Sequence, residues 1–256
     1  MTELISAATL IWEGALAGGL AVFLRIGAAM AVLPGFGEQT LSVRIRLAAT
    51  LALTLLVAPA VAGAMSPPAW GEFARLLGTE TAIGLAFGLM LRLLIHALQI
   101  AGTIAAQSTS LAQLFGGAAV EPLPAIGHLL VVSGLALAAM TDLHLRLAEA
   151  LILTYQLFPA GTPLASGDLA QLGIGHVARA FSLAFSLAAP FVLAAFVYNL
   201  ALGAINRAMP QLMVAFVGAP AITGAALALL ALTAPLMLEV WLTALHATLD
   251  RPFATP

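Results

Sequence analysis

The chain has 256 residues, of which 62% are hydrophobic and 8% are charged, and it contains no cysteine. Soluble domains carry about 25% charged residues, so this composition predicts an integral membrane protein or a subunit buried in a membrane-derived assembly. The lack of cysteine excludes disulfides, thiol catalysis and cysteine-based metal sites. A formal net charge of −2 without any basic patch gives no support for nucleic-acid binding.

Long apolar runs with few or no charges follow one another along the whole chain. A bilayer is crossed by about 20 apolar residues, and backbone groups in lipid must be bonded within helices. We therefore predict an all-α, integral membrane-type protein with about six long hydrophobic helices, some of them kinked or broken at proline. The runs cover residues 4–33, 47–71, 81–91, 93–120, 122–141, 143–159, 180–206 and 208–238.

A stripe of small and charged residues repeats every fourth position along the run 81–91 and at the two residues that flank it. Glu80, Gly84, Gly88 and Arg92 would lie on one face of a helix, where glycines let another backbone approach closely. We interpret the stripe as a helix-packing and subunit-contact face with a charge at either end, and ion conduction is the alternative.

The apolar run that follows ends in hydroxyl and amide side chains and then in glycine. Polar, glycine-rich backbone at membrane depth is tolerated where it is buried in protein or lines a cavity. The segment is therefore either a pore-facing loop or an ordinary connection, and its sequence favours neither. The candidate pore residues are Gln107, Ser110, Gln113, Leu114, Phe115, Gly116 and Gly117.

Three charges lie at the start of the run 143–159 and directly before it. Asp142, Arg146 and Glu149 are spaced by four and three residues, so the arginine can pair with either acid on one helix face. Ionisable groups inside membranes are candidates for function. Because this group nearly neutralises itself, we favour a structural ion pair over a proton relay.

Two polar segments divide the second half of the chain. Residues 159–168 form the longest polar connection, and we place a boundary there, between regions 1–165 and 166–256.

A polar junction then separates two uncharged runs. A lone arginine, a proline and two amides are costly in lipid, so we predict a structural turn at a subunit contact that includes Asn206, Met209, Pro210 and Gln211.

No pattern in the sequence favours an enzyme. The histidines are residues 96, 128, 144, 176 and 246, and no two lie three or four positions apart, so no local metal signature is present. No nucleophile and base converge in a recognisable motif, and we expect no catalytic residue, cofactor or metal. A secondary transporter for a small solute is the main alternative, because such proteins use broken helices.

A set of motifs spread over nearly the whole chain resembles the FliR family of flagellar protein-export-gate subunits, which injectisomes share. The chain departs from the family pattern at Ser42-Val43, Thr103, Ser108-Thr109 and Glu121-Pro122. The matching residues, in order, are Arg25, Pro34, Arg44-Ile45-Arg46, Pro59, Glu80, Gly84, Gly88, Arg92, Gly102, Gln107, His144, Pro159, Gly161, Asn206-Arg207, Met209-Pro210-Gln211, Gly218 and Pro220.

The resemblance implies a channel subunit without catalysis of its own. It implies a FliP-like helical part at 1–165, with a plug loop near 110–122, fused to a FliQ-like helical hairpin at 166–256. The implied partners are FliP and FliQ, the FlhB export-switch protein, exported unfolded flagellar proteins and membrane lipid. The implied location is the bacterial inner membrane at the flagellar basal body. An injectisome homologue remains an alternative.

Overall fold

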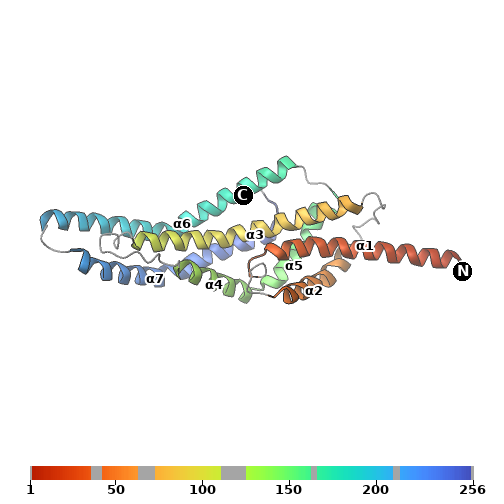
Figure 1. Ribbon diagram of the computed structural model, residues 1–256, viewed down its shortest axis with the longest axis horizontal. Helices are drawn as coiled ribbons and strands as arrows, with labels where there is room; N and C mark the ends of the chain where they lie inside the picture. Colours follow the sequence, from red (N-terminus) through yellow and green to blue (C-terminus); the bar gives the residue numbers. More distant parts are fainter. Residues whose placement is uncertain are drawn as a thin grey trace. The chain divides into compact units, whose positions relative to one another are not determined.

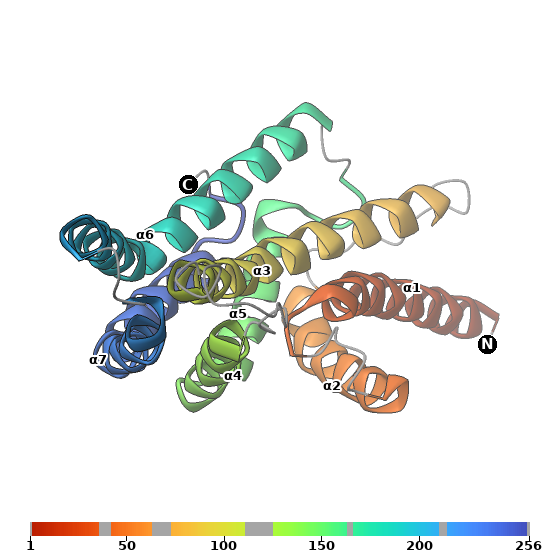
Figure 2. The same ribbon diagram turned by 60° about the vertical axis from the view of Figure 1, so that its left-hand side comes forward.

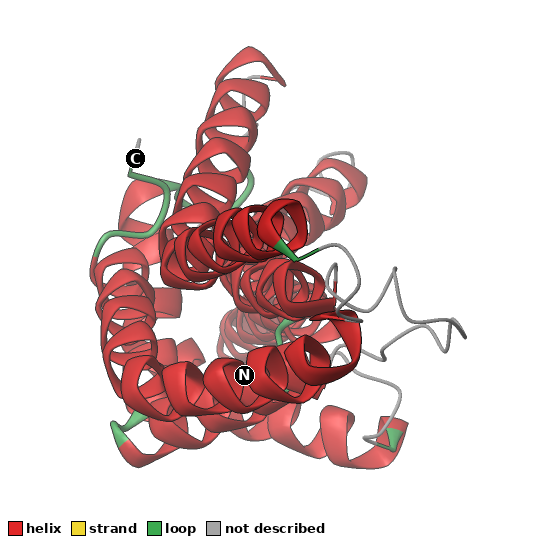
Figure 3. Cartoon of the chain, turned by 90° about the vertical axis from the view of Figure 1, so that its left-hand side faces the viewer, coloured by secondary structure: helices red, strands yellow, loops and turns green. Residues whose placement is uncertain are grey.

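The computed structural model describes residues 2–35, 42–62, 73–110, 125–162, 166–209 and 214–254. Helices make up nearly all of this part of the chain, and none of these residues forms a strand, which confirms the predicted all-α fold (Figures 1 and 3). The helices are α1 (Thr2–Val32), α2 (Val43–Val61), α3 (Phe73–Ser110), α4 (Ala125–Met140), α5 (Leu143–Leu157), α6 (Ser166–Ala208) and α7 (Val214–Asp250).

Several of the helices are long and apolar enough to cross a membrane. Among the described residues these are the segments Val43–Val61, Phe73–Ser108, Gly167–Ala208 and Ala221–Asp250. Helices α4 and α5 are together long and apolar enough as well, if the bent pair is taken as one broken span. The apolar segment Leu16–Val32 of α1 is shorter. The chain is therefore a membrane-type helical protein, as its composition predicts.

The chain folds as two compact units that are interleaved in sequence. The first unit comprises Met1–Leu93, Thr141–Val177 and Leu245–Pro256, and the second comprises Leu94–Met140 and Ala178–Ala244. Each of α3, α6 and α7 contributes one part to each unit. The units describe which residues contact one another. They do not test the boundary predicted between regions 1–165 and 166–256, which stays a prediction.

In the first unit, α1 and α3 cross at very short distance because α3 offers glycine at the crossing. A Cβ atom on Gly84 would overlap the carbonyl oxygen of Arg25, and one on Gly88 would lie 2.6 Å from the carbonyl oxygen of Ala29. Both glycines belong to the predicted packing stripe. The helix that approaches them is α1 of the same chain, and α2 packs against α1 and α5.

In the second unit, the C-terminal part of α3 packs against α4 and α7. A Cβ atom on Gly102 would overlap the backbone of Gly127 in α4, and α3 and α4 lie side by side (Figure 2). The indole of Trp241 is buried and donates a hydrogen bond of 2.8 Å to the carbonyl oxygen of Leu94. Gly134 leaves room for the same indole ring.

The crossing of α1 and α3 generates a first prediction. Gly88→Leu should destabilise the protein by about 1–3 kcal/mol, because added methylenes in a packed site force the backbone apart. Thermal unfolding of the purified chain in mild detergent measures the change. Gly78→Leu on the same helix is the matched control, since nothing lies within 4 Å of a Cβ atom at that exposed position.

The control should be neutral or slightly stabilising, because leucine is a better helix former than glycine. Equal melting temperatures for Gly88→Leu and the parent protein would contradict the packing role of this glycine.

Candidate functional site

A completely buried ion pair joins α1 to α3 in the first compact unit. Arg25 and Glu80 each have 0% exposed side-chain surface. The arginine Nε donates to Oε2 of the glutamate at 2.8 Å, and Nη2 donates to Oε1 at 3.0 Å. This two-point arrangement is the strongest geometry available to a guanidinium and a carboxylate.

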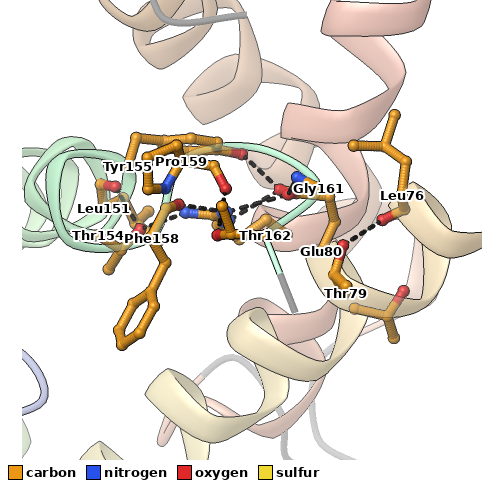
Figure 4. A network of polar contacts seen from close by, with 12 residues as sticks. Leu76, Thr79, Glu80, Leu151, Thr154, Tyr155, Phe158, Pro159, Gly161 and Thr162 are labelled. Carbon is orange, nitrogen blue, oxygen red and sulfur yellow. Dashed lines mark hydrogen bonds and ion pairs between the residues drawn. The ribbon is translucent and has the colours of Figure 1, made fainter. Parts of the chain in front are cut away.

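Glu80 receives two further hydrogen bonds from α5 and the connection after it. The Tyr155 hydroxyl donates to Oε2 at 3.2 Å, and the backbone N–H of Gly161 donates to Oε1 at 3.2 Å (Figure 4). Four donors thus meet the carboxylate, which has about four lone-pair sites. The carboxylate therefore has no acceptor capacity left for a transported ion or a proton.

Arg25 in turn holds the C-terminal end of α5. Its Nη1 donates to the Thr154 hydroxyl oxygen at 3.2 Å, and its Nη2 donates to the carbonyl oxygen of Phe158 at 3.0 Å. Phe158 is the C-cap of the helix, where carbonyl groups lack partners and a cation is favoured. The guanidinium also lies 3.6 Å from the centre of the Tyr155 ring, a favourable cation–π position.

A tight turn places the backbone donor beside Glu80. The N–H of Thr162 donates to the carbonyl oxygen of Pro159 at 3.1 Å, and Gly161, third in this four-residue turn, has φ +77°. A type II turn requires positive φ at that position and favours glycine. The turn opens the connection from α5 to α6, so the buried pair also fixes where that connection starts.

The chemistry of this site is that of a clamp. Both charges are paired and nearly every donor and acceptor around them is used. When the hydrogen-bonding groups of a buried ion pair all have partners, the attraction between the charges offsets the cost of removing them from water. Removal of one partner instead leaves an uncompensated buried charge. We name Arg25, Glu80, Thr154 and Tyr155, with the backbone of Phe158 and Gly161, the buried clamp.

The sequence patterns do not predict the pairing within the buried clamp. They place Arg25 and Glu80 in separate motifs and give no role to Thr154, Tyr155 or Phe158. One signal is available in the sequence: Arg25 lies inside a long apolar run and Glu80 lies at the edge of another, and the two charges have opposite sign. Isolated ionisable residues in membrane segments usually pair with one another.

The predicted ion pair around Arg146 differs from the observed one. Nη1 of Arg146 lies 3.3 Å from Oδ1 of Asp250, and the two side chains are 38% and 62% exposed. The arginine is thus bonded to the end of α7 rather than to Asp142 or Glu149. Asp142 has φ 59° at the start of α5, which takes it off the helical face, and Glu149 is exposed.

The remaining predicted site residues lie at helix ends or outside the described residues. Arg92 is half-exposed on α3, Gln107 is exposed near the end of that helix, and Ser110 is its last residue. Asn206 and Met209 are exposed at the end of α6. The predicted residues that fall outside the described ranges are Gln113, Leu114, Phe115, Gly116, Gly117, Pro210 and Gln211.

No group of three or more histidines and carboxylates within reach of one metal ion occurs among the described residues.

The clamp generates a second prediction. Arg25→Met or Glu80→Leu alone should destabilise the protein by about 3–5 kcal/mol, because each leaves one buried charge unpaired. The double variant should be more stable than either single variant, since both charges are then gone. A double-mutant cycle on thermal unfolding in detergent measures this, with Arg146→Met as the surface-pair control, expected to cost no more than about 1 kcal/mol.

The sign of the coupling free energy between Arg25 and Glu80 tests whether the two charges compensate each other. A double variant that is less stable than both single variants would show that the charges do not compensate each other.

Comparison with known proteins places this chain in one family. The family described as "Bacterial export proteins, family 1" matches residues 16–248. The chain is 35% identical over 233 residues to the flagellar biosynthetic protein FliR of Caulobacter vibrioides, covering 90% of this chain and 93% of that protein.

More distant relatives carry the same name. The FliR protein of Escherichia coli is 28% identical over 222 residues, covering 84% of this chain and 83% of its own length. That of Bacillus subtilis is 26% identical over 208 residues, covering 78% and 80%. The chain therefore belongs to the bacterial export proteins of family 1, as a FliR-type subunit of the flagellar export apparatus.

Proposed function

We propose that this chain assembles with FliP and FliQ into the channel of the flagellar type III export gate, through which unfolded flagellar proteins cross the bacterial inner membrane. The observation that carries the proposal is the continuous similarity over residues 16–248 to this family. The FlhB export switch would bind the same assembly. We assign no catalytic step to the chain. Its role is to form part of the channel wall past which the exported protein moves.

Large apolar side chains on α6 support a place inside an assembly or a bilayer. Leu193, Phe196, Val197 and Leu200 are between 64% and 66% exposed. Apolar patches of this kind are rare on soluble monomers, and they require lipid or partner helices as neighbours. Membrane lipid and the hydrophobic helices of FliP and FliQ are suitable occupants.

The saturated carboxylate of Glu80 argues against the alternative of a small-solute transporter. Such a transporter needs intramembrane groups that bind and release a coupling ion or proton. The only completely buried ion pair among the described residues is held by a full set of donors. A structural role in a channel wall fits that saturation better than an exchange site.

A third prediction tests the assembly. In a strain that lacks its own copy of this gene, the chain should restore flagellar export. Purification through a tag on this chain in mild detergent should recover FliP and FliQ in a single large particle, measured by mass. Restored export together with a chain that purifies only as a monomer or homodimer would contradict the assembly with FliP and FliQ.

A fourth prediction concerns the connection between α3 and α4, which we propose to close the resting channel. Leu114 and Phe115 could fill a narrow pore, where apolar side chains exclude ions by dewetting, and Gly116 and Gly117 supply flexibility. Deletion of residues 113–118 should leave assembly intact and raise ion conductance of the complex in bilayers. An equal deletion at 64–69, between α2 and α3, is the control.

If the 113–118 deletion assembles, exports and conducts no more ions than the parent complex, the segment is only a connection.

A further inference from the structure

The exposed face of α3 changes from apolar to polar side chains along the helix. Leu85 and Leu89 are 38% and 50% exposed, and spacings of three and four residues keep one face in register on an α-helix. The same face continues with polar side chains after Leu89. These are Arg92, His96, Gln99, Thr103 and Gln107, and all of them are exposed or half-exposed.

We name His96, Gln99, Thr103 and Gln107 the polar stripe, and all four belong to the second compact unit. The opposite face of this part of α3 is apolar and buried, with Leu94, Leu98, Ala101 and Ala105 at 0–4% exposure. The stripe is therefore the outward face of an amphipathic segment within the candidate membrane span Phe73–Ser108.

The local hydrogen bonds of the stripe use only some of its polar atoms. Nδ1 of His96 lies 2.7 Å from Oε1 of Gln99 and donates to it, which leaves Nε2 of the ring available. The Thr103 hydroxyl donates to the Gln99 carbonyl oxygen at 2.8 Å. The amide nitrogens of Gln99 and Gln107 donate no hydrogen bond to any other residue that the structure describes, so the face offers both donors and acceptors.

Such a face is incompatible with lipid. Each amide or imidazole without a partner in an apolar medium costs several kcal/mol, and polar groups in membrane spans face water or the interior of a bundle. From His96 to Gln107 the stripe extends for about 16 Å at 1.5 Å per residue. It ends three residues before the end of α3, where the proposed closing segment begins.

We propose that the polar stripe of α3 forms part of the water-filled wall along which the exported polypeptide moves, an inference that rests on the proposed function. The ligand class is an extended, unfolded polypeptide, whose hydrated backbone offers amide donors and carbonyl acceptors. Amide, hydroxyl and imidazole groups can exchange hydrogen bonds with any such backbone. The stripe contains no carboxylate, so basic segments of the passing chain would not be held there.

The absence of cysteine from the chain makes a clean test possible. Single variants His96→Cys, Gln99→Cys, Thr103→Cys and Gln107→Cys are made in the full chain, co-expressed with its partners in a strain lacking the native gene. The assembled complex in membrane vesicles is treated with a charged, membrane-impermeant methanethiosulfonate. The matched controls are Leu129→Cys on α4 and Leu193→Cys on α6, which are 49% and 64% exposed.

Stripe cysteines should react at least about tenfold faster than both controls, because the reactive thiolate forms in water and not in apolar surroundings. A substrate fused to a tightly folded domain should stall in the channel and slow the reaction of the stripe severalfold, with the controls unchanged. With copper phenanthroline added as the oxidant, a cysteine in the stalled segment should also form a disulfide with a stripe cysteine.

Stripe cysteines that react no faster than Leu193→Cys would overturn the inference, as would fast reaction that a stalled substrate leaves unchanged. Four positions are used so that a variant that fails to assemble does not remove the test. Export is measured in parallel. Restored export with an unreactive stripe refutes only this inference, whereas failure of the unmodified chain to restore export refutes the proposed function itself.

Discussion

A guanidinium with no exposed surface needs a carboxylate and further acceptors beside it, because removal of a bare ion from water costs several kcal/mol. Arg25 meets this need with Glu80, with the Thr154 hydroxyl and with the carbonyl oxygen of Phe158. Gly84, one turn beyond Glu80 on α3, lets that helix approach the backbone of the same arginine. The ion pair and the glycine contact are therefore one feature: the short crossing distance allows the bidentate geometry, and the charges fix the register of the crossing.

The second compact unit is held by contacts of a different kind. The Trp241 indole is anchored on the Leu94 carbonyl oxygen, and Gly102, Gly127 and Gly134 let helices approach closely. Contacts of this type can shift without leaving a buried charge unpaired, whereas a shift in the buried clamp would separate Arg25 from its carboxylate. Both the polar stripe and the two helix ends that flank the proposed closing segment belong to this second unit. The part of the chain proposed to face substrate is thus the part whose contacts can adjust at lower cost.

The fold class is predictable from local sequence patterns. Uncharged runs long enough to cross a bilayer must form helices, because only a helix bonds all of its own backbone groups within one segment in lipid. The same reasoning drew attention to Gly84 and Gly88 by their spacing. It could not pair Arg25 with Glu80, since spacing rules relate residues three or four apart and these two lie on different helices. It also assigned Arg146 to partners on its own helix, whereas the backbone of Asp142 leaves the helical region and Asp250 comes from α7. The pore segment and the turn at Pro210 lie outside the described residues and stay predictions.

The outer faces of two helices imply two different surroundings. The outer face of α6 stays apolar over several turns, with Phe185, Phe196 and Leu200 at 60–66% exposure. The outer face of α3 changes from Leu89 to Gln99 within about 15 Å, at 1.5 Å per residue. A chain surrounded only by lipid would have to bury the amides of α3, and a chain in water would have to cover the aromatic rings of α6. Both faces are satisfied when one borders water and the other borders lipid or apolar helices, which is the condition of a subunit in the wall of a channel.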